Sequence, residues 1–350
     1  MRIPDKILII RFSSLGDILL ASPLLRVLHR SFPRTRVDFL LKAEYADLVR
    51  YHPAVTSVLT LPADGSEDLK ALRHQIRAER YDVILDLHNS LRSRAVRFLS
   101  GARHVYSVNK RVIRRFLLVN LKKNFYREIV PVAERYLETV SKLGLSKDIQ
   151  GLELFVPDET MSRVATMMSR YKLEKFSLVV GIAPSARHAT KRWPPERFRD
   201  LGVRLAKERR AKILLFGGPE ETDYCGDIAQ MINAEAGSSP AESLAGKLSL
   251  LETAAALDHC ALFVSNDSGL MHMAAARGRK VLAIFGSTVR EFGFFPYGTP
   301  AAVLEAGPLP CRPCSHIGRE ACPEGHFRCM KEISVEEAFA AVRTMTEAVE

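Results

Sequence analysis

The segment 265–278, SNDSGLMHMAAARG, places a polar cluster directly before a short apolar helical stretch. The cluster consists of Asn266, Asp267, Ser268 and Gly269, and His272 lies about one helical turn further on. A helix N-terminus exposes unpaired N–H groups and a partial positive charge, so it binds phosphate readily. A helix cap by Asp267 or Ser268 is the simpler alternative, but a cap needs only one such side chain. We therefore interpret this turn as a phosphate-binding site.

A second polar turn, RFSSLGD, occupies residues 11–17 and follows the first predicted strand. Ser14 and Asp17 match the capping box S-x-x-D, which explains them without any further function. A carboxylate at a helix N-terminus is also kept ionised by the helix dipole, which suits a group that must accept a proton. Asparagine still accepts a hydrogen bond, so Asp17→Asn is expected to cost about 1 kcal/mol or less, as cap changes do.

A third polar loop, PSARHATKRWPPERF, covers residues 184–198 and also follows a predicted strand. It carries Lys191, two positions before Trp193. The ammonium of Lys191 can meet a phosphate as a point charge. A solvated surface lysine is the alternative interpretation.

Several well-known motifs are absent from the sequence. It contains no G-x-x-x-x-G-K-[ST] and no G-x-G-x-x-G after the first strand, which disfavours P-loop enzymes and dinucleotide dehydrogenases. It also contains no H-E-x-x-H and no G-x-S-x-G, the motifs of zinc proteases and α/β-hydrolases.

The elements that must position these loops alternate between strand and helix patterns. The first half predicts strands at 6–12, 36–42 and 81–87, with helices at 16–32 and 90–99. The second half repeats the pattern, with strands at 177–185, 211–218, 261–267 and 280–287 and helices at 194–209, 249–260 and 269–278. Such alternation predicts two doubly wound parallel sheets, whose ligands bind outside the carboxyl ends of the strands. The boundary is expected within the polar, Met-rich segment 158–176, and Ser334 and Glu337 predict a capped helix at the C-terminus.

Length and composition agree with two globular domains. The chain has 350 residues, of which 47% are hydrophobic and 26% charged. Its apolar runs are too short to span a bilayer. The N-terminal segment resembles a signal peptide only superficially, because Arg11 and Asp17 interrupt its apolar run. We expect a cytosolic protein.

The net charge of +11 is concentrated in segment 92–127, which contains no acidic residue. Like charges at this density repel each other unless something neutralises them. The segment therefore predicts an anionic partner, which composition alone leaves open as nucleic acid, phosphorylated sugar or membrane surface. A solvated face that keeps the protein soluble is the alternative.

Four of the six cysteines form a cluster near the C-terminus: Cys311, Cys314, Cys322 and Cys329, with His316 and His326 nearby. The spacing is C-x2-C-x7-C-x6-C, which is compatible with a zinc or iron–sulfur site. A disulfide is disfavoured in a reducing cytosol. Free thiols packing a loop are the interpretation favoured over either.

Four segments together carry a family resemblance: KILIIRFSSLGDILLASPLLRVL, YDVILDLHNSLRSR, KRWPPERF and SNDSGLMHMAAARGRKVLAIFGST. They resemble the heptosyltransferases of lipopolysaccharide core synthesis, glycosyltransferase family 9, over about residues 5 to 335. The resemblance implies the glycosyltransferase B fold, an α/β architecture of two Rossmann-like domains facing across a cleft. It implies an acceptor-binding domain at 1–160, a nucleotide-sugar-binding domain at 175–330 and a helix at 334–350 that packs back on the first domain. It also implies transfer of a heptose from ADP-heptose with inversion, with no cofactor and no required metal.

The resemblance also implies roles for individual residues. Asp17 corresponds to the proposed base, with Ser14 beside it, and Lys191 to the residue that binds the donor phosphate. Glu220 corresponds to a carboxylate near the adenosine. The donor-binding turn corresponds to Asp267, Ser268, Gly269 and His272. The loop before Lys191 reads SARHATK, without the two threonines that some members use, so the sugar contacts differ here.

The expected partners follow from the same resemblance. The acceptor is an anionic lipid-linked oligosaccharide, and the arginines expected to face it are Arg92, Arg94, Arg97, Arg111, Arg114 and Arg115. We expect a cytoplasmic enzyme with peripheral contact at the inner membrane and no nucleic-acid partner. Two other hypotheses stay open at this point: a sugar-nucleotide epimerase of similar fold, and a basic nucleic-acid-binding protein, although the aromatic spacing of a stacking platform is absent.

Overall fold

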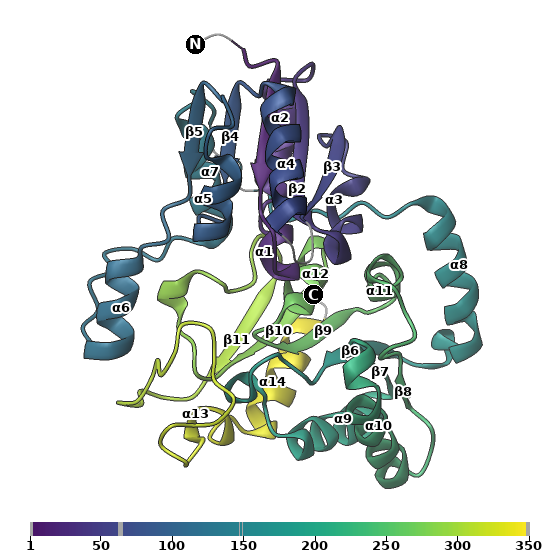
Figure 1. Ribbon diagram of the computed structural model, residues 1–350. Coiled ribbons are helices and arrows are strands. Elements are labelled where there is room, and N and C mark those ends of the chain that lie inside the picture. The colour runs from purple at the N-terminus through teal and green to yellow at the C-terminus, as the bar shows by residue number, and fades with distance from the viewer. Residues whose placement is uncertain (1–2, 62–65, 147, 149, 348–350) are drawn as a thin grey trace. The chain divides into compact units, whose positions relative to one another are not determined.

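The chain forms two compact units, each built around a parallel sheet (Figure 1). The computed structural model describes residues 3–61, 66–146, 148 and 150–347. The first unit contains Met1–Val112 and Val130–Phe155, and the second contains Ile113–Ile129 and Val156–Glu350.

The sheet of the first unit has the strand order β3-β2-β1-β4-β5, with every pair parallel. Its strands are β1 (Lys6–Ile10), β2 (Arg36–Lys42), β3 (Ser57–Leu61), β4 (Val83–Asp86) and β5 (His104–Ser107). Leu8 and Ile10 of β1 pack against Ile76 and Val96, which come from α4 (Ser66–Glu79) and α5 (Leu91–Arg97). Ile7 and Ile9 alternate with them and are equally buried, so both faces of the sheet are covered by helices, as expected for a parallel sheet.

The helix expected at 16–32 is interrupted. The structure has α1 (Leu15–Leu19) and α2 (Ser22–Ser31) in its place. Pro23 lies in the first turn of α2, where its missing N–H costs nothing. In a continuous helix its ring would clash with the carbonyl of Leu19, which explains the break. The remaining helices of the first unit are α3 (Asp47–Arg50) and α7 (Val132–Ser141).

The sheet of the second unit has the strand order β11-β10-β9-β6-β7-β8, again parallel throughout. Its strands are β6 (Leu178–Ala183), β7 (Ala211–Leu215), β8 (Ala241–Ser243), β9 (Leu262–Asn266), β10 (Lys280–Phe285) and β11 (Ala301–Glu305). Its helices are α8 (Asp158–Met168), α9 (Pro195–Arg209), α10 (Thr222–Ala236), α11 (Leu250–Leu257), α12 (Gly269–Ala276), α13 (Arg328–Lys331) and α14 (Val335–Thr346). The strands and helices expected from the second half of the sequence are confirmed.

The C-terminal helix α14 contributes to the core of the second unit. The capping box is present, because the Glu337 N–H donates to Ser334 Oγ at 3.2 Å and the Ser334 N–H donates to Glu337 Oε2 at 2.8 Å. The buried face of α14, however, belongs to the core of the second unit, where Ala338 and Val342 lie with residues of α9 and β10. The expected packing of this helix on the first domain stays a prediction.

The expected boundary between the domains is also shifted. Helix α6 (Val112–Leu121) and the chain up to Ile129 group with the second unit, although they fall inside the predicted first domain, 1–160. The reason is specific anchoring, because Lys122 Nζ donates to the carbonyls of Cys311 at 3.0 Å and Pro313 at 2.6 Å. The segment 158–176, expected as a boundary, contains α8, which packs on α11.

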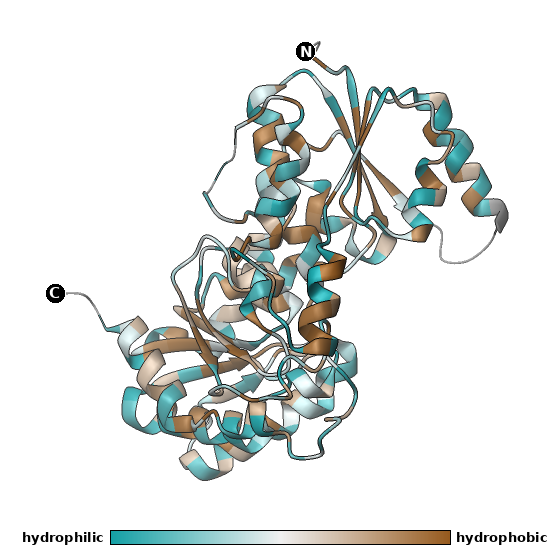
Figure 2. Ribbon diagram, turned by 90° about the vertical axis from the view of Figure 1, so that its left-hand side faces the viewer, coloured by the Kyte–Doolittle hydropathy of each residue, from teal (hydrophilic) through white to brown (hydrophobic). Residues whose placement is uncertain are grey.

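Helix α6 exposes an unusually apolar surface. It projects at the left of Figure 1 and faces the viewer in Figure 2, where it is largely coloured as hydrophobic. Within it only Leu118 is buried. The exposed apolar side chains are Val112, Ile113, Phe116 and Leu121. Among the described residues, no helix is long and apolar enough to cross a bilayer.

Candidate active site

The second sheet reverses its winding between its two central strands. From β6 the chain proceeds outward to β7 and β8, whereas from β9 it proceeds to β10 and β11 on the other side. The loops after β6 and β9 therefore diverge at their carboxyl ends, which is where doubly wound sheets bind ligands. These two loops carry Lys191 and Asp267, so the topology brings together two residues that the sequence singled out separately.

Asn266, at the end of β9, ties the two loops together. Its side chain is fully buried, and its Nδ2 donates to the carbonyl of Pro184 at 2.8 Å. Its Oδ1 accepts the backbone N–H of Trp193 at 3.0 Å. One amide thus holds both ends of the Lys191 loop. A buried amide with these partners is costly to remove, because they would lose their hydrogen bonds.

Lys191 and Asp267 form an ion pair at the centre of this site. Lys191 Nζ lies 2.6 Å from Asp267 Oδ2, and Thr288 Oγ1 donates to the same oxygen at 2.8 Å. The side chains of Lys191 and Asp267 are 15% and 7% exposed. An ammonium has three N–H donors, and Asp267 occupies one of them. Lys191 is therefore oriented by Asp267 and keeps donors for an anion.

Helix α12 begins directly beside this pair. Its N-cap is Ser268, whose hydroxyl contacts Ser265 Oγ at 3.0 Å and makes no cap hydrogen bond to the helix. Asp267 is held by Lys191 and Thr288. The structure therefore shows neither residue in the simple capping role, and the N–H groups of the first turn, from Gly269 on, are not capped by these side chains.

Two other predicted donor residues lie on neighbouring elements of the same unit. His272 is buried in α12, with 3% of its surface exposed. Glu220 is exposed in the 3-10 turn η5 (Pro219–Glu221) that follows β7. In this turn Glu221 makes the local contact, accepting the Gly218 N–H at 2.7 Å, which leaves Glu220 directed to the surface.

Asp17 lies in the first unit, in a network of one ion pair and several hydrogen bonds. Arg11 Nη2 is 2.5 Å from Asp17 Oδ1, and Tyr136 OH donates to the same oxygen at 3.4 Å. The N–H and the hydroxyl of Ser14 both donate to Asp17 Oδ2, at 3.3 and 3.1 Å. The predicted capping box is therefore partly present, and the hydroxyl of Ser14 is directed at Asp17.

The charge state of Asp17 follows mainly from Arg11. Burial on its own raises the pKa of the Asp17 carboxyl, but the attraction and hydrogen bond of Arg11, with the hydrogen bonds from Ser14, outweigh it and lower the pKa overall. The sequence argument assigned this effect to the helix dipole. The helix dipole is the smaller effect, because α1 has only five residues, whereas the full charge of the Arg11 guanidinium lies 2.5 Å from the carboxylate.

The basic stretch does not form one free surface. Arg97 contacts the buried carboxylate of Asp86 at 3.2 Å, and Arg111 contacts Glu138 at 3.5 Å. Both acids lie outside the segment 92–127, which explains how its charge is tolerated. Burial lowers the pKa of Arg115. Arg94 is exposed and contacts only Asn89 among the hydrogen bonds described, at 3.2 and 3.3 Å.

The predicted acceptor arginines also divide between the units. Arg92, Arg94, Arg97 and Arg111 belong to the first unit, and Arg114 and Arg115 to the second. Arg114 and Arg115 lie on α6, among its exposed apolar side chains.

Three side chains of these networks were not assigned a role from the sequence, namely Arg11, Tyr136 and Thr288, and Asn266 was named only as a member of the polar turn. Arg11 and Asn266 stand inside the motifs RFSSLGD and SNDSG, so their position at strand ends was available as a signal. Thr288 follows β10 as the last residue of FGST. Tyr136 comes from α7, and no local pattern points to it.

A family model described as glycosyltransferase family 9 (heptosyltransferase) matches residues 69–323. Lipopolysaccharide heptosyltransferase 2 of Escherichia coli (strain K12) is 29% identical over 300 residues, which cover 82% of this chain and 84% of that protein.

Two solved structures share the fold. A family 9 glycosyltransferase from Veillonella parvula DSM 2008 has a TM-score of 0.78 at 21% identity and covers 97% of both chains. An E. coli heptosyltransferase with ADP-2-deoxy-2-fluoro heptose has a TM-score of 0.67 at 21% identity, covering 97% of this chain and 99% of that one. The expected fold class, with two parallel-sheet α/β domains of the glycosyltransferase B type, is confirmed.

Proposed function

Because the chain belongs to glycosyltransferase family 9, the heptosyltransferase family, and is therefore a glycosyltransferase, we propose that it transfers a heptose from ADP-heptose to the inner-core oligosaccharide of lipopolysaccharide. The relative from E. coli K12 supports the pathway, and the solved heptosyltransferase with a fluorinated ADP-heptose supports the donor. The second unit binds the nucleotide sugar in this proposal, the first binds the acceptor, and α6, which groups with the second unit, contacts the membrane surface that carries the acceptor.

The observation that carries the proposal is the Lys191–Asp267–Thr288 cluster beside the N-terminus of α12. The leaving group of the reaction is a diphosphate, whose charge must be stabilised as the sugar departs. Lys191 supplies a cation, and the first turn of α12 supplies backbone N–H groups. Asp267 holds Lys191 in place, and Glu220 contributes near the adenosine.

In the chemical step, the acceptor oxygen attacks the anomeric carbon on the face opposite the diphosphate. The bond from that carbon to the phosphate oxygen breaks, and ADP leaves. The proton of the acceptor hydroxyl passes to Asp17. With its lowered pKa, Asp17 is a weak base. It suffices because the hydroxyl becomes acidic as its oxygen bonds to the electron-poor carbon.

Two experiments test this function. Calorimetry should detect ADP binding to the purified chain, and no binding at millimolar concentration would contradict the donor site. Mass spectrometry after incubation with a panel of sugar nucleotides and truncated core acceptors should show a heptose added from ADP-heptose. Addition of a different sugar would exclude this donor while leaving the glycosyltransferase class intact.

Turnover should survive a chelator. Lys191 and the α12 N-terminus stabilise the diphosphate without a soluble cation, so the initial rate of heptose transfer, measured directly after EDTA is added, is expected to stay unchanged. A slow loss of rate that zinc restores would point to the cysteine cluster instead of the donor site. The measurement is the rate with EDTA and with added magnesium. A loss in EDTA that magnesium restores and zinc does not would show that a metal, rather than Lys191, neutralises the leaving group.

The acceptor proposal uses the exposed Arg94 and helix α6, which carries the half-buried Arg114. A helix that combines basic residues with exposed apolar side chains suits an anionic membrane surface, where a lipid-linked acceptor lies. We include peripheral contact with the cytoplasmic membrane in the proposal for this reason.

The double variant Arg94→Glu/Arg114→Glu should raise the KM for the acceptor by about tenfold or more, at about 1 kcal/mol for each basic residue near an anionic surface. ADP affinity should stay within about twofold of the parent value, since neither residue belongs to the donor site. Arg97→Glu is the comparison, and it should lower the melting temperature because it leaves Asp86 buried without its cation. Equal damage to ADP and acceptor binding by the double variant would mean that these arginines stabilise the fold.

A further inference from the structure

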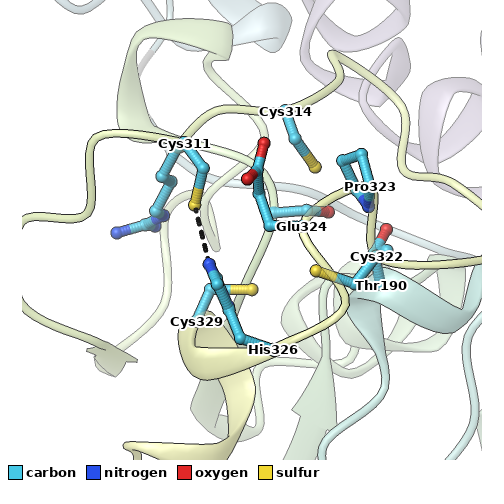
Figure 3. Close-up of a pocket in the computed structure, with 10 residues that line it drawn as sticks. Thr190, Cys311, Cys314, Cys322, Pro323, Glu324, His326 and Cys329 are labelled. Carbon is cyan, nitrogen blue, oxygen red and sulfur yellow. Dashed lines mark hydrogen bonds between the residues drawn. The ribbon is translucent and has the colours of Figure 1, made fainter.

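We infer that Cys311, Cys314, Cys322 and Cys329 bind one divalent metal ion, zinc or iron, through four thiolates, and that this ion holds the loop carrying Lys191. All four cysteines line a single pocket with His326 and Thr190. Figure 3 shows their sulfur atoms directed toward one another around its centre.

The chain brings these thiols together from one short segment. Cys311 and Cys314 are the two ends of a C-x-x-C turn, Cys322 lies in the following loop, and Cys329 lies on α13. Cys329 is buried and the other three are half-buried, and none of the four forms a disulfide. Four cysteine sulfurs that line one pocket are the donor set of a structural, tetrahedral site.

His326 is placed as a partner of a ligand and not as a ligand itself. Its Nδ1 accepts the backbone N–H of Arg328 at 3.0 Å, so the ring proton of the neutral imidazole sits on Nε2. Nε2 lies 3.7 Å from Cys311 Sγ and donates to it. A hydrogen bond of this kind stabilises a thiolate ligand and orients it.

Soft thiolates select zinc or iron over magnesium and calcium. Binding releases four protons to solvent as the thiols become thiolates. In the described part of the chain, where the cysteines are free thiols, no group of three His, Cys, Asp or Glu side chains is close enough to hold a metal ion. The sulfurs must therefore draw together as their protons leave, which the loop between Cys314 and Cys329 permits because it contains no strand and no helix before α13.

The cysteine segment is bonded to the Lys191 loop. The Arg319 N–H donates to Thr190 Oγ1 at 2.8 Å, and the Thr190 N–H donates to the Arg319 carbonyl at 3.1 Å. Thr190 directly precedes Lys191, so a movement of residues 315–321 shifts the ammonium.

A second connection runs through Arg312. Its guanidinium donates to the Thr288 carbonyl at 2.7 Å, and Thr288 holds Asp267 through its hydroxyl. Both partners of the Lys191–Asp267 pair are thus supported by the segment that the metal would fasten. The effect on ADP rests on the proposed function, whereas the metal site does not.

Elemental analysis of the full chain, purified in reducing buffer without chelator, tests the site. We expect one zinc or iron ion per chain, and cobalt substitution should produce the absorption of a tetrahedral thiolate complex. Cys314→Ser and Cys322→Ser should lose the ion. Cys225→Ala, at a buried cysteine outside the cluster, and Glu324→Gln should retain it. His326→Gln should retain the ion with about 10- to 100-fold lower affinity.

Three results would overturn the inference. These are a reduced chain that takes up no zinc, iron or cobalt, a native disulfide within the cluster, and full metal content in the two serine variants. ADP affinity provides the second measurement and should fall by about fivefold or more in Cys322→Ser. Unchanged ADP affinity in this metal-free variant would refute the link to Lys191. If ADP fails to bind even the metal-loaded chain, the proposed function fails and the metal content still decides the site.

Discussion

Asp17→Asn is expected to lower turnover per folded molecule by about 10²- to 10⁴-fold, the usual cost of removing a general base. Asparagine keeps the size of the side chain and accepts hydrogen bonds from Ser14, but it cannot take the proton of the acceptor hydroxyl. ADP affinity should be unchanged, because the donor cluster lies on other residues. Steady-state rates, normalised to the folded fraction measured by circular dichroism, check this result.

The structure changes the expected stability of this variant. As a cap alone, Asp17→Asn would cost about 1 kcal/mol or less. The carboxylate, however, neutralises Arg11, which is 8% exposed. Removing one partner of a buried ion pair costs about 3–5 kcal/mol, so the variant should melt well below the parent. The double variant Arg11→Met/Asp17→Asn should recover part of this stability and none of the turnover.

Asp38→Asn is the matched control for Asp17. Asp38 is fully buried in β2, forms an ion pair with Arg36 at 2.9 Å and accepts a hydrogen bond from Tyr81 OH at 2.6 Å. Asp17 has the same kinds of partner, an arginine and a tyrosine hydroxyl. It lies near the start of its strand, away from the carboxyl ends. Asp38→Asn should lose stability and keep its turnover per folded molecule. If Asp17→Asn behaves in the same way, Asp17 is a structural residue and the base must be sought elsewhere.

The lowered pKa of Asp17 also has a consequence for pH. The carboxylate contributes stability that is present above its unfolded pKa and is lost only as the pH falls through the lower folded pKa. Turnover should therefore show no acid limb due to this group between neutral pH and about pH 5. A midpoint inside that range that disappears in Asp17→Asn would contradict the Arg11 argument.

Lys191→Met is expected to weaken ADP binding by about 30-fold or more, because truncating one partner of a buried charged contact costs about 2–5 kcal/mol. Methionine keeps much of the length of the side chain and removes the charge. The turnover of bound substrate should fall as well, since the leaving diphosphate loses its cation. Calorimetry with ADP measures the first effect directly.

Two further variants separate binding from folding. Lys191→Met leaves Asp267 without its cation, so Lys191→Met/Asp267→Asn should recover stability while ADP binding stays weak. Lys247→Met removes a lysine from the exposed pair with Glu242 and should change ADP affinity by less than about twofold. Recovery of both stability and ADP affinity in the double variant would show that Lys191 serves only the fold.

The sequence by itself determined the features whose causes are local. The strands β1, β2, β4, β6, β7, β9 and β10 were predicted because each is a short apolar run bounded by polar residues or glycines. The α14 cap was predicted because Ser334 and Glu337 lie within one turn of each other. The polar turns after β1, β6 and β9 were predicted as sites because each places polar or basic side chains between a strand and the following helix, at the end of the strand where doubly wound sheets bind ligands.

Only the tertiary structure decided which of these residues meet. Lys191 pairs with Asp267 because β6 and β9 are neighbours in the sheet, and Asp17 has a low pKa because Arg11 is folded against it. The apolar face of α14 predicted burial but not the unit that buries it, and the basic run 92–127 did not reveal its partners Asp86 and Glu138. An amphipathic face or a charge is complementary to many surfaces, and the choice among them is made by long-range packing, which no short stretch of sequence encodes.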